Sequence, residues 1–261
     1  AVKLTGAVDF GKFEESFQIL IDRHEILRTF FKTNEEEEVQ QYVLPSELAG
    51  FKILSKDLSS AKNQKDEVSS YLQALNNKPF DLEKAPLIRS SLIQLNNSEY
   101  VFFLSLHHII ADGWSIELLI SEIIKIYNNI SQGKTINLPE LSIQYKDYAV
   151  WLNGKLDQEE YFRSEQYWLQ KFEGELPVLD LPSFKKRPLV QSYNGDTISH
   201  QFSQEFLKKL KIFAKERDVT LFMILMSGIK SLLHRYTDQD DITVGTPVAG
   251  RNHPDLETQM G

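Results

Sequence analysis

The amino-acid sequence predicts an α/β or α+β protein built from two lobes, and three observations support this fold class. Patterns typical of helices and of strands alternate along the chain. A stretch at 176–195 is rich in proline and has little apolar periodicity, which is typical of a linker. The 261 residues are 41% hydrophobic, which is enough for one large core or two smaller ones.

These patterns predict a first lobe at 1–175, a linker at 176–195 and the beginning of a second lobe at 196–261. The chain starts at Ala1 without a methionine and ends at Gly261, directly after a motif-like stretch. We therefore expect a piece of a longer protein in which the second lobe is incomplete.

The first lobe begins with a predicted helix and a predicted hairpin. Apolar residues at helical spacing indicate a helix over 9–24, with Asp9 available as its N-cap. Strand-like runs at 26–32 and 39–44 flank the acidic stretch 35–38. The pattern predicts a hairpin whose acidic turn is solvated.

A second helix, two strands and a third helix follow. Apolar spacing predicts a helix over 68–75, and the runs 87–95 and 100–106 read as strands. The second of these strands leads directly into His107 and the histidine that follows it. Ser115 lies where a cap would start the next helix, so we expect the paired histidines at a strand-to-loop-to-helix junction.

The rest of the chain alternates in the same way. Aromatic residues at steps of three or four over 145–173 predict a buried helix face. In the second lobe, the pattern predicts a strand at 196–202, helices at 204–216 and 221–236, and a strand at 242–248.

The composition excludes several classes of function. The formal net charge of -8 argues against nucleic-acid binding, which needs clustered Lys and Arg. The absence of cysteine excludes disulfides, thiolate nucleophiles and Cys-ligated zinc. No apolar run reaches the roughly 18–20 residues of a membrane helix, and residues 1–9 lack the features of a signal peptide. We expect a soluble, cytoplasmic protein that acts on small molecules or other proteins.

Two imidazoles and a carboxylate crowd together only at His107, His108 and Asp112. A metal site is disfavoured, because adjacent residues on an extended strand point to opposite faces. The other histidines have no HExxH or similar ligand spacing: His24, His200, His234 and His253. A serine relay is also disfavoured, because no G-x-S-x-G elbow occurs and Ser115 has a capping role.

The remaining interpretation gives the two histidines different roles. One imidazole faces a cleft while its neighbour packs inward, and Asp112 holds the turn through an ion pair. Gly113 would let the backbone approach closely or adopt a positive φ. Taken alone, two structural histidines are the simpler explanation, and the surrounding motifs are what favour a functional role.

The string HHIIADGWS at 107–115 matches the HHxxxDG signature of the condensation domains of nonribosomal peptide synthetases. It resembles the subtype that joins two L-configured units. Further matches occur in the order of the family's motifs: RHEILRTFF at 23–31, PFDL at 79–82 with Pro86, Leu87 and Arg89, YKDYAVW at 145–151, and VGTPVAGR at 244–251. The resemblance therefore covers nearly the whole chain.

The chain departs from related families and, at one point, from this one. Epimerization domains carry a segment similar to DGVSWR, whereas residues 112–116 are DGWSI. Heterocyclization domains have aspartates in place of the histidines, so both relatives are disfavoured. The family's earliest motif, a segment with serine and glutamine before the first helix, is missing.

The resemblance implies a fold and a set of partners. The fold is a V-shaped pair of chloramphenicol acetyltransferase-like lobes with a tunnel between them. Upstream and downstream peptidyl carrier proteins deliver thioesters on phosphopantetheine arms, and an adenylation domain lies adjacent. No cofactor is bound directly, and the implied reaction is attack of the acceptor's amine on the donor's thioester.

The resemblance also implies roles in the site. The candidate catalytic set is His107, His108, Asp112 and Gly113. His108 is the proton acceptor or the group that positions the amine, while His107 packs. Asp112 is structural and pairs with an arginine, for which Arg28 and Arg251 are candidates. Gly113 supplies backbone approach and is a candidate N–H donor to the oxyanion.

Further side chains near the motifs are assigned in the same way. Arg23 and Arg28 are either part of the site or ion-paired ends of a helix and a strand. Trp114 and Ser115 are candidates for lining the tunnel. The alternatives are an inactive or carrier-binding interaction domain of the same fold, an epimerization-type relative, and a free-standing acyltransferase that uses coenzyme A.

Overall fold

The structure is a computed structural model that describes residues 1–156, 158–182, 188–192 and 195–261. The chain forms two compact units, Ala1–Phe162 with Ala249–Gly261, and Arg163–Val248. Part of the predicted linker at 176–195 lies outside the described residues. The segment 249–261, which the sequence assigns to the second lobe, packs with the first unit because Met260 belongs to that unit's core. The lobe boundaries themselves stay a prediction.

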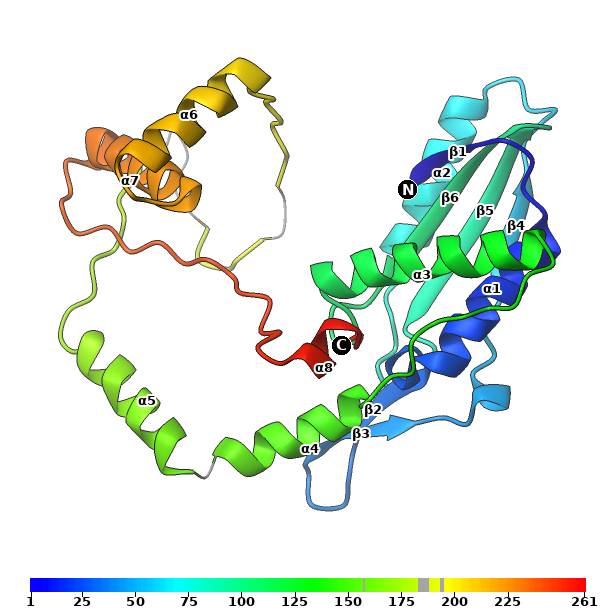
Figure 1. Cartoon of the computed structure of the whole chain (residues 1–261), viewed down its shortest axis with the longest axis horizontal. Coiled ribbons are helices and arrows are strands. Elements are labelled where there is room, and N and C mark those ends of the chain that lie inside the picture. Colours follow the sequence, from blue (N-terminus) through cyan, green and yellow to red (C-terminus); the bar gives the residue numbers. More distant parts are fainter. Residues whose placement is uncertain (157, 183–187, 193–194) are drawn as a thin grey trace. The chain divides into compact units, whose positions relative to one another are not determined.

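A four-stranded sheet lies at the centre of the first unit, with the strand order β1-β6-β5-β4 (Figure 1). Its strands are β1 Val2–Thr5, β4 Ile53–Asp57, β5 Ile88–Asn96 and β6 Glu99–Leu106. The strands β5 and β6 form an antiparallel hairpin, β1 is antiparallel to β6, and β4 is parallel to β5. The two strands predicted at 87–95 and 100–106 are thereby confirmed.

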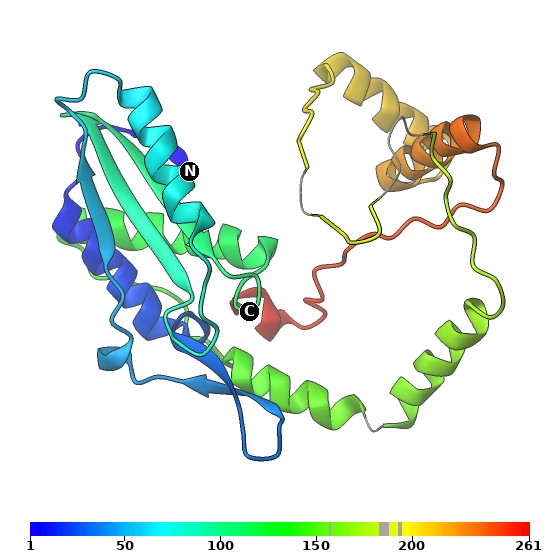
Figure 2. The same cartoon turned by 180° about the vertical axis from the view of Figure 1, so that it is seen from behind.

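Helices cover both faces of this sheet. The helices α1, Phe10–Arg23, and α3, Gly113–Ser131, lie on one face, and α2, Gln64–Asn77, lies on the other (Figures 1 and 2). The Asp9 side chain accepts a hydrogen bond from the Lys12 amide, so the predicted N-cap of α1 is confirmed. The core between the sheet, α1 and α3 contains these fully or nearly buried side chains: Phe17, Leu20, Ile21, Ile88, Leu92, Phe102, Leu119, Ile123 and Ile126.

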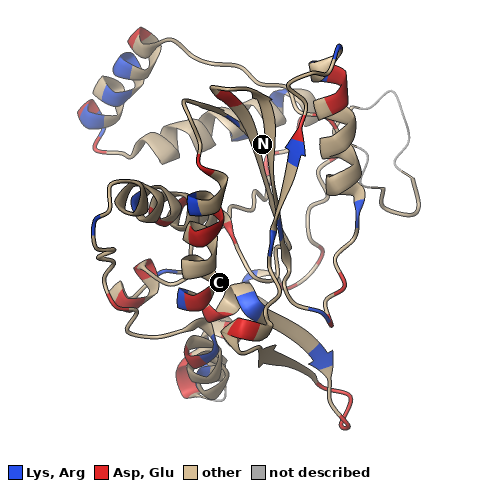
Figure 3. Cartoon of the chain, turned by 90° about the vertical axis from the view of Figure 1, so that its right-hand side faces the viewer, with Lys and Arg blue, Asp and Glu red and all other residues tan. Residues whose placement is uncertain are grey.

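The predicted hairpin near the first helix is present but shorter than expected. The strands β2, Thr29–Thr33, and β3, Val39–Val43, pair antiparallel, and the 3₁₀ helix η1, Glu25–Arg28, takes the place of the first part of the predicted strand. Ile26 and Leu27 are both buried, which alternation along a strand does not allow when one face is solvated. The acidic tip of the hairpin is exposed, as predicted (Figure 3).

The aromatic segment forms two helices, α4 Tyr145–Leu156 and α5 Glu159–Lys171, but its predicted burial is wrong. Trp151, Phe162 and Trp168 are each more than half exposed. Rings three or four residues apart stack along the surface of their own helix, with 5.8 Å between the centroids of Tyr148 and Trp151. The spacing therefore identifies the helices and not what covers them.

The second unit contains two predicted helices that are confirmed, α6 Gln204–Glu216 and α7 Leu221–Thr237. The strands predicted at 196–202 and 242–248 are not formed, because neither run has a hydrogen-bonded neighbouring strand among the described residues. A short helix, α8 Pro254–Glu257, follows in the segment that belongs to the first unit. Within the described residues, no helix combines the length and the apolar character that crossing a bilayer requires.

Candidate active site

The paired histidines lie where the sequence predicts, between the end of β6 at Leu106 and the start of α3 at Gly113. The cap of the helix differs from the prediction. Asp112 is the N-cap, and its Oδ1 accepts the Ser115 amide at 2.8 Å, so Ser115 lies inside the first turn. A carboxylate at this position stabilises the amide groups and the positive end of the helix dipole.

His107 is half-buried, and its backbone and ring shape the turn. Its amide donates to the Leu87 carbonyl at 3.0 Å, and its carbonyl accepts the Ile110 amide at 3.1 Å. Its ring Nδ1 accepts the Ile109 amide at 3.1 Å. This last bond requires an unprotonated Nδ1, so the neutral ring carries its proton on Nε2. His107 therefore uses one ring nitrogen to hold the turn.

His108 differs from its neighbour in both exposure and contacts. Its side chain is exposed, whereas that of His107 is half-buried. Among the described residues, none makes a hydrogen bond or an ion pair with the His108 ring. No described residue therefore occupies either ring nitrogen of His108.

Asp112 joins the start of α3 to the segment 249–261. Its Oδ2 lies 3.4 Å from Nη2 of Arg251, a side chain that is only 7% exposed. Its Oδ1 accepts the Ser115 hydroxyl at 2.7 Å, and that hydroxyl accepts the Gly261 amide at 3.1 Å. Arg251 Nη2 also donates to the Gly261 carbonyl at 2.6 Å. The four residues thus form one connected polar network.

This network determines the charge state of Asp112. Partial burial raises the pKa of its carboxyl, but the hydrogen bonds from the Ser115 hydroxyl and amide and the charge of Arg251 lower it by more. The pKa of Asp112 therefore lies below its ordinary value, and the group is a carboxylate at neutral pH. A carboxylate with these bonds is suited to bracing the turn and the helix rather than to exchanging protons.

Arg28 and Arg23, the other arginines singled out from the sequence, have different partners. Arg28 Nη2 lies 3.6 Å from Glu25, and Arg28 Nη1 donates to the Leu44 carbonyl, so Arg28 joins η1 to the end of the hairpin. Arg23 Nε lies 3.2 Å from Glu122 Oε2. Of the two arginines considered as partners of Asp112, the structure therefore pairs it with Arg251.

The residues that follow Asp112 lie in three different environments. Gly113 does not have a positive φ, so that part of the expectation is wrong; a Cβ at this position would meet nothing within 4 Å, which leaves open space beside its backbone. Trp114 is 40% exposed, and its Nε1 donates to the Glu257 carbonyl at 2.9 Å. Ser115 is completely buried, and so it does not line a tunnel as the sequence suggested.

Sequence reasoning missed a buried charged cluster between α1 and α3. His24 Nε2 lies 2.7 Å from Glu122 Oε2, and both side chains are almost fully buried, with Arg23 on the same carboxylate. Burial raises the pKa of Glu122, while the hydrogen bond and charge of His24 and the charge of Arg23 lower it by more. A glutamate among Leu119, Ile123 and Ile126 on the apolar face of α3 was the signal that could have revealed the cluster.

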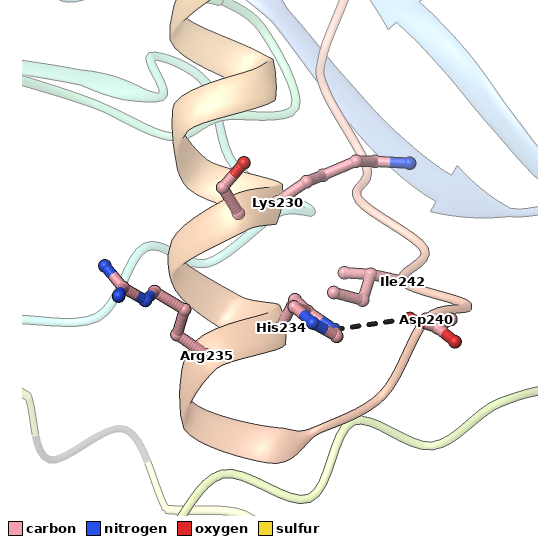
Figure 4. Close-up of a pocket in the computed structure, with 6 residues that line it drawn as sticks. Lys230, His234, Arg235, Asp240 and Ile242 are labelled. Atoms are coloured by element: carbon pink, nitrogen blue, oxygen red, sulfur yellow. Dashed lines mark ion pairs between the residues drawn. The ribbon is translucent and has the colours of Figure 1, made fainter.

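Two cavities that are lined in part by a histidine lie away from the histidine turn. One of about 420 Å³ lies between α4 and the segment 249–261, and Trp151, Asn252 and His253 are among its lining residues. The other, of about 390 Å³, lies in the second unit at the end of α7 (Figure 4). There His234 Nδ1 lies 3.0 Å from the Gln239 carbonyl, so that ring holds its own loop. Within the described ranges, no three His, Cys, Asp or Glu side chains are arranged to hold a metal ion.

Comparison with known proteins identifies the family. A model of the condensation domain matches residues 1–261. Bacitracin synthase 1 of Bacillus licheniformis is 40% identical over 261 residues, which are 100% of this chain and 5% of that protein. Surfactin synthase subunit 2 of Bacillus subtilis (strain 168) is 40% identical over 258 residues, which are 99% of this chain and 7% of that protein. The chain belongs to the condensation-domain family of nonribosomal peptide synthetases, whose members are amide-forming acyltransferases.

Solved structures confirm the fold. The first condensation domain of the calcium-dependent antibiotic synthetase, in complex with a substrate analogue, matches with a TM-score of 0.79 at 19% identity over 99% of this chain and 60% of that one. The X-domain from teicoplanin biosynthesis matches with a TM-score of 0.80 at 22% identity over 99% of this chain and 57% of that one. The fold is the mixed α/β, chloramphenicol acetyltransferase-like fold. This chain spans 60% of the length of the first of the two solved chains.

Replacing Asp112 with alanine should destabilise the first unit by more than the loss of one helix cap. Asp112→Ala removes the cap of α3 and leaves Arg251 buried beside no carboxylate, so we expect a loss of about 3 kcal/mol. Asp9→Ala, which removes only the cap of α1, is the matched control and should cost about 1 kcal/mol. Urea unfolding measures both, and equal losses would contradict a structural role for the pair.

The Glu122 cluster should make stability sensitive to acid. Because folding lowers the pKa of Glu122, its contribution is present above the ordinary value of 4.5 and is lost as the pH falls below it. We expect Glu122→Gln to be less stable than the wild type at pH 7, with a difference that shrinks below about pH 4. Unfolding by urea across this pH range is the measurement, with the exposed Glu117→Gln on the same helix as control. A difference that does not change with pH would refute the linkage.

Proposed function

We propose that the chain forms peptide bonds between two carrier-bound thioesters. In this reaction the amine of the acceptor aminoacyl thioester attacks the donor acyl or peptidyl thioester, and both substrates are held on the phosphopantetheine arms of carrier proteins. One observation carries the proposal. His108 presents an exposed ring that has no partner among the residues the structure describes, at the junction where the family's motif lies.

The proposed chemistry does not need a strong base, but it does need a correctly placed amine and proton acceptor. An α-amino group has a pKa of about 7.7 to 8.0, so roughly a tenth or more of it is neutral near pH 7. The amine nitrogen bonds to the thioester carbon, and the tetrahedral intermediate then breaks the C–S bond and releases the donor's thiolate. Before that step the ammonium must lose a proton, and an imidazole is suited to accepting it or to orienting the amine.

His108 takes that role in the proposal, because His107 is already engaged. The Nδ1 atom of His107 holds the Ile109 amide, and its backbone is bonded on both sides. Asp112 acts as a brace for the turn, held by Arg251. The open space beside Gly113 admits a substrate backbone, and the Gly113 amide at the positive end of α3 is the candidate donor to the oxyanion.

The proposed partners are an upstream and a downstream peptidyl carrier protein and an adjacent adenylation domain. The support is the family and the length of its members, since the chain spans about 5% of bacitracin synthase 1. The substrates arrive already activated on their carriers, so the reaction needs no cofactor bound by this chain. We also propose that residues 1–175 and 196–261 belong to two lobes joined by 176–195.

An interaction domain of the same fold is the alternative. The X-domain from teicoplanin biosynthesis, whose fold this chain shares, is also known in a complex with OxyB. Such a domain would bind a partner without using His108. The alternative and the proposed acyltransfer therefore differ in what a substitution at His108 does.

Replacing His108 should stop amide formation without unfolding the protein. In the full-length protein with both carriers loaded, we expect His108→Ala to lower the rate by about 100-fold or more, because proton transfer or amine orientation is lost. Intact-protein mass spectrometry of the acceptor carrier, which gains the donor acyl group, is the measurement.

The matched control is His200→Ala, an exposed histidine in the second unit. It should leave the rate unchanged, and both variants should keep the melting temperature of the wild type. Near-normal amide formation by a folded His108→Ala variant would overturn the proposed function and favour an interaction domain.

A further inference from the structure

An aromatic side chain outside the histidine motif contacts the motif directly. The Phe80 ring lies 6.0 Å from the His107 ring, centroid to centroid, with the two planes perpendicular. Phe80 is only partly buried and lies beside the core rather than in its centre. Perpendicular ring pairs at this distance are attractive and also fix the orientation of both rings.

Phe80 is in turn held by Arg89 of β5. The Arg89 guanidinium carbon lies 3.7 Å from the centroid of the Phe80 ring, which places the cation against the ring face. The same guanidinium donates to the carbonyls of Leu75 at 3.3 Å, Pro79 at 2.6 Å and Lys78. Arg89 thus fastens the end of α2 and the loop carrying Phe80 to the sheet.

The register of the sheet brings this support close to the histidines. Arg89 pairs with Ser105 in the ladder between β5 and β6, two residues before His107. The carbonyl of Leu87, the residue before β5, accepts the hydrogen bond of the His107 amide. Arg89 therefore contacts Phe80, and Phe80 contacts His107 directly. The Arg89 guanidinium and the His107 ring each also make hydrogen bonds with backbone groups.

We propose that Phe80, held by Arg89, is a positioning residue for the condensation reaction, an inference that rests on the proposed function of His108. Phe80 limits the rotation of the His107 ring, and the His107 Nδ1 bond to the Ile109 amide then sets the path of the turn. His108 lies inside that turn, and its ring has no hydrogen-bond or ion-pair partner in the described part of the chain. Its direction therefore depends on a backbone that its neighbour's ring holds.

The geometry separates this role from simple packing. A phenylalanine that is only partly buried contributes less to stability than one in the centre of the core, so its loss leaves a folded protein. Displacing a reacting group by about 1 Å can cost roughly 100-fold in rate even when the site is otherwise intact. A positioning residue therefore affects kcat, while KM for the carriers stays unchanged.

The test compares three variants of the full-length protein. Phe80→Met removes the ring and keeps most of the apolar volume, and Phe80→Tyr keeps the ring. Arg89→Met removes the cation together with its hydrogen bonds to the backbone carbonyls at the end of α2. We expect Phe80→Met and Arg89→Met to lower kcat by about 10- to 100-fold with KM for both loaded carriers changed less than about twofold. Phe80→Tyr, which keeps the ring, should keep kcat close to the wild-type value. The matched control is Arg217→Met in the second unit, where the guanidinium carbon lies 5.3 Å from the centroid of the Phe213 ring. This variant loses a similar cation and should keep the wild-type kcat and KM.

The outcomes separate failure of the proposed function of His108 from failure of the positioning role of Phe80. An active His108→Ala variant overturns the proposed function and the positioning role with it. An inactive His108→Ala variant beside a folded Phe80→Met with normal kcat overturns the positioning role alone. Equal losses in Phe80→Met and Phe80→Tyr, or a rise in KM that accounts for the loss, also overturn it. If Phe80→Met fails to fold, Arg89→Met carries the same comparison.

Discussion

The site depends on one carboxylate, that of Asp112. It caps α3, it accepts the Ser115 hydroxyl, and it pairs with Arg251, a residue 139 positions away in sequence. The Asp112 carboxylate thereby holds together the start of α3, the buried Ser115 hydroxyl and the segment 249–261. The two histidines lie between this point and the end of β6, so both ends of their loop are held. An exposed imidazole can be oriented only if the backbone that carries it is fixed in this way.

The two adjacent histidines differ in the contacts that hold them. His107 spends its Nδ1 on the Ile109 amide and packs against Phe80, and so cannot exchange a proton at that atom without loosening the turn. His108 makes neither kind of contact among the described residues. The proposed function therefore assigns contact with the substrate to His108 rather than to His107. The Phe80 and Arg89 contacts extend this support beyond the residues of the motif.

Much of the fold around the site could be predicted from the sequence, because local patterns determine it. Alternation identified the hairpin of β5 and β6, and helical spacing with Asp9 identified α1. What failed required knowledge of distant partners. The strands expected at 196–202 and 242–248 have no neighbouring strand in the part of the chain that the structure describes, and aromatic rings such as Trp168 lie exposed along helices. Neither a missing neighbour nor a missing cover is encoded in the local pattern.

The site was predictable to the same degree and for the same reason. The position of the histidines at a strand-to-helix junction followed from the residues, while the choice of Arg251 over Arg28 as partner of Asp112 depends on a contact across 139 positions. Ser115 was assigned to a lining role, yet its hydroxyl completes a buried network with Asp112. The cluster of His24 and Glu122 joins helices 98 positions apart, and only a misplaced charge on an apolar face pointed to it.

The central claim is that His108, and not His107, meets the reacting amine. The most direct measurement is a crystal structure of the full-length protein with an acceptor aminoacyl analogue bound. The account predicts the amine nitrogen within about 3 Å of a ring nitrogen of His108, with the His107 Nδ1 still bonded to the Ile109 amide. An amine bound to His107, or one placed beyond the reach of both rings, would contradict it.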